Sequence, residues 1–483
     1  MHELDVYAVQ EHFSEECGVA GIFNKGELSP DVLYFALHAL QHRGQESAGI
    51  ATINGKKIAQ YKNLGLVSEV FNPQSISQFK GAKIAVGHVR YSTKGSNTVV
   101  NAQPLVANYR NGVLAVAHNG TILNSAALAK RLQNEGAVFQ TQTDTELFVH
   151  LLARYSHLDI QSAIRTMMND LKGSYSLVMA NEHMLIGVRD PKGIRPLCLG
   201  KKGDSYILAS ESVALDAVGA SLIRDIEPGE IIMISDQGAK SLRYDPLAGH
   251  APSALCIFEY VYLARPDSVI DGLDVMGSRL RVGASLARLA PVEADMVAGV
   301  PDSGLAAAIG YSHESGIPYG DALIKNRYVG RSFIQPEQSM RELAVRMKLN
   351  AAAANVRGKR IVLIDDSIVR GTTSKRLVDM LKSAGAKEVH MRICSPPVNF
   401  PCYFGIDTPS KKHLISATHS IEDIRKMIGA DTLTYLPLEA LVSAVRNKSD
   451  VSFCTGCFDG NYPLDVEKCR RCAFALPSGG PPL

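Results

Sequence analysis

Residues 362–374 read VLIDDSIVRGTTS, and this stretch is the clearest indication of the fold of the C-terminal half of the 483-residue chain. An apolar run ends in two adjacent acids, Asp365 and Asp366, and a polar turn then leads into a helical pattern. The turn carries Ser367, Arg370, Gly371, Thr372 and Thr373. Carboxylates after a strand can face ribose hydroxyls or Mg²⁺, and a Gly-Thr-Thr turn at a helix N-terminus can bind a phosphate. A plain strand followed by a Thr-capped helix is the alternative, although capping does not require two acids.

The segments around this stretch alternate between strand and helix patterns. Apolar runs at 294–300, 358–366 and 388–395 predict strands, and KRLVDMLKSAG (375–385) predicts a helix. Strand, turn, helix and strand in this order predict a parallel sheet with its ligand site at the carboxyl ends of the strands. VPDSG (300–304) forms a second turn after a strand, although Asp-Ser-Gly alone is common in turns.

This half resembles the type I phosphoribosyltransferases, and the resemblance implies a site for phosphoribosyl pyrophosphate. The implied ligands of the donor are Asp365, Asp366, Ser367, Arg370, Gly371, Thr372, Thr373 and Lys325. It further implies one Mg²⁺ per subunit, with Ser303, Asp365 and Asp366 reaching the metal and its pyrophosphate. The basic stretch 325–350 is either a solvated face or, as the resemblance implies, a mobile loop that closes over the donor.

The first half of the chain is rich in short apolar runs with helical patterns between them. Residues 18–23, 82–93, 113–122 and 174–180 predict strands, while 31–41 and 143–155 predict helices. This mixture predicts layered sheets covered by helices. A stretch rich in Pro, Gly and Ala, YDPLAGHAPS (244–253), predicts the domain boundary.

Cys17 opens the segment CGVAGIF and has two interpretations. A lone cysteine in a strand is usually a small core residue. Four further motifs follow in order, however: QHRGQESAGIA (41–51), GHVRYST (87–93), HNGTI (118–122) and TDTE (143–146). Together they resemble the glutaminase domain of the N-terminal-nucleophile amidotransferases, which implies an α+β fold of αββα layers and makes Cys17 the nucleophile.

A cysteine nucleophile needs a nearby base, and no single histidine is an obvious partner in the sequence. The α-amine of Cys17 can serve, because its reference pKa of about 7.7–8.0 lies near neutral pH. Residues 1–16 would then be a propeptide that is removed. The resemblance further implies that Asn119 and Gly120 form the oxyanion hole, and that Arg90 and Asp144 bind the α-carboxylate and α-ammonium of glutamine. The same resemblance makes Arg43, in QHRGQ, a structural or coupling residue.

Nine cysteines are an odd number, which argues against a disulfide framework. Two C-x-x-C pairs, Cys454 with Cys457 and Cys469 with Cys472, have a spacing that suits a zinc knuckle. The resemblance implies a different metal site: one [4Fe–4S] cluster per subunit, held by Cys256, Cys402, Cys454 and Cys457. Cys469 and Cys472 depart from that pattern. Cys198 and Cys394 lie in apolar runs and are predicted core residues.

The composition is that of an ordinary globular protein. Lys and Arg number 51 against 48 Asp and Glu, which predicts no nucleic-acid partner. The acidic N-terminus is unlike a secretory signal, and no apolar run approaches the roughly 18 residues of a membrane span. We therefore expect a cytoplasmic protein without a membrane partner. The expected organisation is a propeptide (1–16), a glutaminase domain (17–250), a phosphoribosyltransferase domain (251–472) and a flexible tail (473–483).

Taken together, the two halves resemble the iron–sulfur branch of the amidophosphoribosyltransferase family. This implies a glutamine-dependent enzyme that moves ammonia to phosphoribosyl pyrophosphate, forming 5-phosphoribosylamine and pyrophosphate at the first committed step of purine synthesis. It also implies a homo-oligomer that purine nucleotides inhibit.

Two rival functions differ in chemistry. A glutaminase coupled to a sugar-phosphate isomerase would not need the DDSIVRGTT stretch. A regulatory protein that only senses phosphoribosyl pyrophosphate would not need the glutaminase motifs.

Overall fold

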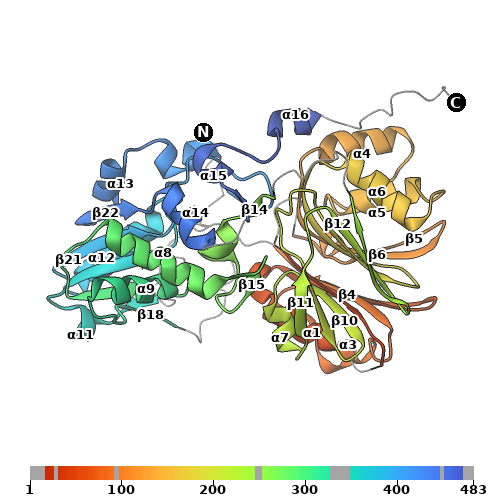
Figure 1. The fold of residues 1–483 in the computed structure, drawn as a ribbon, viewed down its shortest axis with the longest axis horizontal. Coiled ribbons are helices and arrows are strands. Elements are labelled where there is room, and N and C mark those ends of the chain that lie inside the picture. Colours follow the sequence, from red (N-terminus) through yellow and green to blue (C-terminus); the bar gives the residue numbers. More distant parts are fainter. Residues whose placement is uncertain are drawn as a thin grey trace, which may run out of the picture.

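The computed structural model describes residues 17–26, 31–91, 97–244, 253–326, 349–408, 410–446 and 451–471. The predicted propeptide, the predicted boundary at 250–251, most of the basic stretch 325–350 and the predicted tail lie outside these residues. Figure 1 shows two halves side by side, with the first half of the sequence forming one and most of the second half forming the other.

Two antiparallel sheets form the N-terminal half, as the strand patterns predict. The first has the order β11 (Ser221–Asp225), β9 (Cys198–Lys202), β10 (Ser205–Ala209), β1 (Gly18–Phe23), β4 (Ile84–Arg90), β2 (Ser47–Asn54) and β3 (Lys57–Leu64). The second has the order β13 (Gly238–Arg243), β12 (Glu230–Ser235), β8 (Leu185–Arg189), β7 (Gly173–Ala180), β6 (Gly112–Ile122) and β5 (Leu105–Tyr109).

The two sheets pack face to face, and helices cover both outer faces. Side chains alternate along β1, so that Ala20 and Ile22 meet helices while Val19 and Phe23 meet the second sheet. The first sheet is covered by α1 (Val32–Ala39), α2 (Val67–Val70), α3 (Pro73–Ser77) and α7 (Val213–Ala217). The second is covered by α4 (Ser125–Asn134), α5 (Glu146–Arg154) and α6 (Ile160–Asp170). These αββα layers confirm the predicted fold.

A parallel sheet forms the centre of the C-terminal half. Its order is β17 (Met296–Gly299), β20 (Arg360–Asp365), β21 (Glu388–Ile393) and β22 (Thr432–Tyr435). One face packs on α8 (Val275–Leu289), α9 (Leu305–Ser315) and α14 (Leu438–Arg446). The other packs on α12 (Thr372–Ser383) and α13 (Ile421–Ile428). The predicted α/β arrangement is confirmed. Because helices cover both faces of this sheet, its strands are continuous apolar runs.

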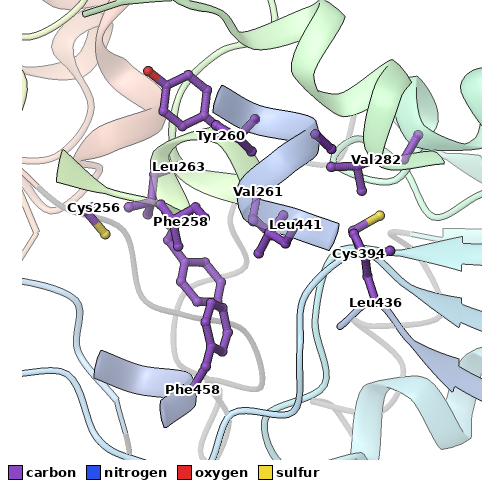
Figure 2. Close-up of a cluster of buried hydrophobic side chains, with 14 of the residues drawn as sticks. Cys256, Phe258, Tyr260, Val261, Leu263, Val282, Cys394, Leu436, Leu441 and Phe458 are labelled. Atoms are coloured by element: carbon purple, nitrogen blue, oxygen red, sulfur yellow. The ribbon is translucent and has the colours of Figure 1, made fainter. Parts of the chain in front are cut away.

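Short elements complete this half. They are a hairpin of β18 (Leu323–Lys325) and β19 (Leu349–Ala351), the parallel pair β14 (Leu255–Cys256) and β23 (Phe453–Cys454), the pair β15 (Val269–Ile270) and β16 (Leu273–Asp274), and the helices α11 (Ala353–Val356), α15 (Gly456–Asp459) and α16 (Val466–Arg471). The chain crosses between the halves through a buried apolar cluster that includes Cys256, Phe258, Tyr260 and Phe458 (Figure 2). Within the described residues, no helix is long and apolar enough to cross a membrane.

Helices α8 and α9 pack closely because small residues face each other. A Cβ atom added at Gly283 would lie 1.8 Å from the carbonyl oxygen of Ala307, and one at Gly310 would lie 2.0 Å from that of Leu280. Both obstacles are main-chain atoms, which cannot rotate away. The two glycines therefore set the distance between the helices.

We expect Gly283→Ala to lower the free energy of unfolding by about 1–3 kcal/mol, because the methyl group forces the two helices apart. Urea titration followed by circular dichroism measures this loss. Ser285→Ala on the same helix is the matched control and should change stability by less than about 0.5 kcal/mol. Equal stability of the two variants would contradict close packing at Gly283.

Candidate active sites

The first site lies where the start of β1 meets the end of β4. Gly18 pairs with Val89, so Cys17 lies beside Arg90 at the edge of the sheet. The Cys17 thiol lies 3.6 Å from the carbonyl oxygen of Tyr91 and is half-buried. A pocket at this edge is lined by Cys17, Arg90, Tyr91, Gln103, His118, Gly120, Thr143 and Asp144. Four of the five predicted residues of this site thus share one pocket.

Asn119 is the fifth predicted residue of this site. It follows His118 on β6, but unlike the other four it does not line the pocket. Its side-chain nitrogen is buried and has no hydrogen-bond partner among the described residues, so a donor is available next to Gly120. Gly120 itself has a φ of +138°, and a Cβ there would lie 2.2 Å from the carbonyl oxygen of Ser174. Only glycine fits this backbone conformation and this close approach.

Asp144 is held in place by two neighbours before helix α5 begins. Its Oδ2 accepts a hydrogen bond from the backbone N–H of Ile122 at 2.9 Å, and its Oδ1 lies 3.5 Å from Nδ1 of His118. A carboxylate and a guanidinium in one pocket can together bind an amino acid, the carboxylate holding its α-ammonium and the guanidinium its α-carboxylate. Arg90 and Asp144 provide such a pair of opposite charges in one pocket.

Sequence reasoning missed Tyr91, Gln103, His118 and Thr143 as pocket residues. Gln103 accepts a hydrogen bond from the backbone N–H of His118 at 2.8 Å, which ties two segments of the pocket wall together. Beneath them lies His88, whose Nε2 is 3.0 Å from the carbonyl oxygen of His118. Burial lowers the pKa of His88 to about 3, so this ring is neutral. The histidine of the HNG motif was a visible signal for His118.

The second site lies at the carboxyl ends of β17 and β20. Gly299 pairs with Ile364 in the parallel sheet, so the turns that follow these strands are adjacent. Across this edge, Ser303 donates a hydrogen bond to Oδ2 of Asp366 at 2.5 Å, and Ser367 donates to Oδ1 of the same carboxylate. The structure therefore brings the PDSG turn and the DDSIVRGTT turn together, as expected from the strand order.

Gly371 immediately precedes helix α12 with a φ of +82°, and the helix begins with Thr372 and Thr373. The N-terminus of this helix faces the same edge as the carboxylates, and such an end favours anions. Lys325, at the end of β18, forms an ion pair with Asp302 next to Ser303. The edge thus combines acidic groups, a helix N-terminus and a lysine.

Asp365 and Asp366 are both buried, and they repel each other. Burial and the neighbouring charge of Asp366 raise the pKa of Asp365 well above its usual range. Oδ2 of Asp365 has no hydrogen-bond partner among the described residues. Two close carboxylates with an open oxygen suit a cation such as Mg²⁺, which prefers oxygen ligands.

The four cysteines of the predicted iron–sulfur site share one neighbourhood. Cys256 and Cys454 are direct partners in the β14–β23 pair, and Cys402 and Cys457 pack against the same apolar cluster. Burial and then the other three thiols raise the pKa of Cys457 well above its usual range. Among the described residues, no three His, Cys, Asp or Glu side chains are arranged to hold a single metal ion. The four thiols of a [4Fe–4S] cluster need not converge on one ion, because each thiolate binds a different iron.

Comparison with known proteins matches each half of the chain to a domain family. The description "Glutamine amidotransferase domain" matches residues 88–217, and "Phosphoribosyl transferase domain" matches residues 284–394. The chain thus combines a glutamine amidotransferase with a phosphoribosyltransferase. Amidophosphoribosyltransferase of Archaeoglobus fulgidus is 50% identical over 460 residues, covering 94% of this chain and 100% of the relative. That of Bacillus subtilis is 49% identical over 457 residues, covering 94% and 95%.

Solved structures agree. Glutamine phosphoribosylpyrophosphate amidotransferase from B. subtilis, complexed with ADP and GMP, superposes with a TM-score of 0.87 at 48% identity, covering 93% of this chain and 98% of that one. A structure described as the allosteric regulatory enzyme of purine biosynthesis has a TM-score of 0.88 at 46% identity, covering 96% and 100%. The chain belongs to the amidophosphoribosyltransferase family.

We expect Asp365→Asn to raise the melting temperature of the ligand-free protein and to abolish turnover. A carboxyl whose pKa is raised by folding costs stability as pH rises above its unfolded value of about 3.9. The gain should therefore be small near pH 4 and grow to about 1–3 kcal/mol at neutral pH. Scanning calorimetry across this pH range measures it.

Asp379→Asn is the matched control, because Asp379 is an exposed acid of α12 that pairs with Lys375. It should show no such pH-dependent gain. A loss of stability in Asp365→Asn at neutral pH would contradict repulsion between the two carboxylates.

Proposed function

We propose that this chain transfers the amide nitrogen of glutamine to phosphoribosyl pyrophosphate, giving 5-phosphoribosylamine, glutamate and pyrophosphate. The observation that carries the proposal is that one chain of this family combines a pocket lined by Cys17, Arg90 and Asp144 with a strand-end cluster of Ser303, Asp366 and Ser367. Ammonia released at the first site passes inside the protein to the second. The reaction would be the first committed step of purine synthesis, in the cytoplasm.

At the first site Cys17 is the nucleophile. Its thiolate attacks the amide carbon of glutamine, and its own α-amine takes the thiol proton and delivers it to the departing ammonia. The side-chain nitrogen of Asn119 and the backbone N–H of Gly120 stabilise the oxyanion, and such a donor is worth about 3–4 kcal/mol. Arg90 binds the α-carboxylate and Asp144 the α-ammonium. Water then hydrolyses the thioester and releases glutamate.

This mechanism requires that the propeptide, residues 1–16, is removed, because an amide nitrogen is not basic. The proposed organisation is a glutaminase domain (17–250), a phosphoribosyltransferase domain (251–472) and a short tail (473–483). The described residues on either side of 245–252 support a boundary there, since the layered sheets precede it and the parallel sheet follows it.

At the second site the chain binds and orients the donor. Asp365 and Asp366 face the ribose, while Ser367, Arg370, Gly371, Thr372 and Thr373 hold the 5′-phosphate, and Lys325 meets the pyrophosphate. One Mg²⁺ per subunit would be held by Ser303, Asp365 and Asp366, and when bound it would supply positive charge for the leaving pyrophosphate. Ammonia attacks the anomeric carbon as pyrophosphate leaves, so the chain acts here by positioning rather than as a nucleophile.

We further propose one [4Fe–4S] cluster per subunit, held by Cys256, Cys402, Cys454 and Cys457. Their shared neighbourhood supports this assignment. A cluster there would join the start of the C-terminal half to its end. The competing zinc site uses Cys454, Cys457, Cys469 and Cys472, of which Cys472 lies outside the described residues.

Purine nucleotides are proposed feedback inhibitors, and the chain is proposed to form a homo-oligomer. Support for inhibition comes from the B. subtilis relative, which was solved with ADP and GMP.

We expect Cys17→Ala to abolish glutamine-dependent formation of 5-phosphoribosylamine while activity with ammonium salts persists, because the second site needs no thiol. A pyrophosphate-release assay with each nitrogen donor measures both activities. Intact mass spectrometry of the active wild-type protein should show that it begins at Cys17. A fully active protein that still carries Met1 would contradict the role of the α-amine.

We expect Cys402→Ser to bleach the brown colour of anaerobically purified protein and to impair folding, because binding of a structural metal centre is coupled to folding. The Cys469→Ser, Cys472→Ser double variant is the matched control and should keep colour, iron and activity. Visible absorption and iron analysis distinguish the two. A colourless wild-type protein with one zinc per chain would overturn the cluster.

A further inference from the structure

Four charged side chains are buried together where the two halves of the chain meet. Arg43, Arg195 and Glu211 belong to the layered half, and Glu259 lies in the π-helical turn Glu259–Leu263, beyond the proposed boundary. The exposed fraction is 2% for Arg43 and 0% for the other three. Charges buried this deeply are retained only with well-placed partners, and π-helical turns are frequent at functional sites.

Arg43 is the centre of this cluster, and it touches the proposed nucleophile. Its Nε donates to the carbonyl oxygen of Cys17 at 3.3 Å. Its Nη2 donates to Oε1 of Glu259 at 2.7 Å, and its Nη1 donates to Oε2 of Glu259 at 3.0 Å and to Glu211. One planar guanidinium therefore bridges the main chain of Cys17 and a carboxylate from the other half.

Glu211 is held independently of Glu259. Its Oε1 also accepts from Nε2 of His42, and its Oε2 accepts from the hydroxyl of Ser268 at 2.6 Å and the backbone N–H of Arg265. Burial alone would raise the pKa of Glu211, but the charges of His42 and Arg43 lower it below its usual range. Loss of Glu259 would thus leave Glu211 as the single carboxylate among the described partners of Arg43.

Glu259 and the turn that carries it are held by two further arginines. Nη1 of Arg195 lies 3.4 Å from its Oε1, and the same arginine donates to the carbonyl oxygen of Phe404 at 2.8 and 2.9 Å. On the C-terminal side, Arg279 of α8 donates to the carbonyl oxygens of Tyr260 and Ala264, both at 2.8 Å. The turn is thus clamped at its start and its end, and Tyr260 and Val261 pack into the apolar cluster of Figure 2.

We propose that Glu259 is a positioning residue for glutamine hydrolysis, which places the Cys17 main chain through Arg43 although it belongs to the phosphoribosyltransferase half. The inference rests on the proposed role of Cys17 as nucleophile. A bidentate carboxylate locks the plane of the guanidinium, and that plane aims Nε at the Cys17 carbonyl. The glutaminase site is complete only when the second half of the chain is docked against it.

The test uses Glu259→Gln in the full-length, matured protein. Gln keeps the size and one acceptor of Glu259 but places an amide donor against the Arg43 guanidinium. We expect kcat for glutamine hydrolysis to fall about 10- to 100-fold, the effect typical of a small misplacement of a reacting group. KM for glutamine should change less than about twofold, because Arg90 and Asp144 are untouched, and activity with ammonium salts should stay within about twofold of wild type.

Glu230→Gln is the matched control. Glu230 is also a buried glutamate that binds an arginine, Arg224, but it lies on β12 without a contact to the cluster. Both variants should lower thermal stability, and only Glu259→Gln should lower kcat with glutamine. If a folded Glu259→Gln hydrolyses glutamine with the kcat of Glu230→Gln, the pair serves stability alone and the proposal is wrong.

If Glu259→Gln does not fold, the test uses Arg43→Lys instead. Lysine keeps the positive charge, but a single ammonium cannot reach the Cys17 carbonyl and both carboxylates in one plane. The same fall in kcat at unchanged KM is expected, and wild-type kcat in this variant overturns the proposal. Cys17→Ala separates the two claims. If this variant still uses glutamine, the proposed nucleophile is wrong. If it does not, but Glu259→Gln and Arg43→Lys keep the wild-type kcat, only the positioning role is wrong.

Discussion

The ion pair between Arg43 and Glu259 is the constraint on which the arrangement of the two halves depends. Both partners are buried, and Glu259 would lose the two arginines of the layered half, Arg43 and Arg195, if the halves separated, whereas Arg43 would keep Glu211. Breaking one partner of a buried pair typically costs about 3–5 kcal/mol, far more than an exposed pair contributes. The docking of the layered half on the parallel half is therefore specified by charge as well as by the apolar cluster around Phe258 and Phe458.

The two proposed sites each lie at an edge of a sheet where strands end: Cys17 beside the end of β4, and Asp366 beyond the end of β20. The loop that carries Cys402 reaches the same junction, because its Phe404 carbonyl oxygen accepts hydrogen bonds from Arg195 and from Ser174. The loop of Cys402 is thus tied to the layered half by buried hydrogen bonds.

Much of the fold follows from the sequence because local patterns determine it. The runs at 18–23 and 113–122 match β1 and β6 to within a residue, and the strand that ends in Asp365 matches β20. The DDSIVRGTT turn could be placed at a strand end and next to the PDSG turn, since parallel strands present their carboxyl ends at one edge. Cys198 and Cys394 are buried as predicted.

The remaining features depend on contacts between distant residues. Gln103 lines the first pocket through tertiary folding, and nothing in its immediate neighbours marks it, whereas Thr143 stands next to Asp144 in the TDTE motif. Arg43 and Glu259 lie 216 positions apart, and each resembles a surface charge when read alone. One signal was available: Glu259 is a single acid within the apolar run LCIFEYVYLA, and a buried acid requires a cationic partner. Its partner could not be identified without the structure.

The central claim is that the two sites work as one enzyme, with ammonia passing between them inside the protein. The most direct test supplies glutamine labelled with nitrogen-15 in the amide, together with an excess of unlabelled ammonium salt, at a pH where both support turnover. Mass spectrometry of the trapped 5-phosphoribosylamine then reports the source of its nitrogen. The account predicts that product made from glutamine keeps its label, above the level expected from mixing with the bulk ammonia. Label diluted to the bulk ratio would show that ammonia escapes to solvent, and would contradict the account.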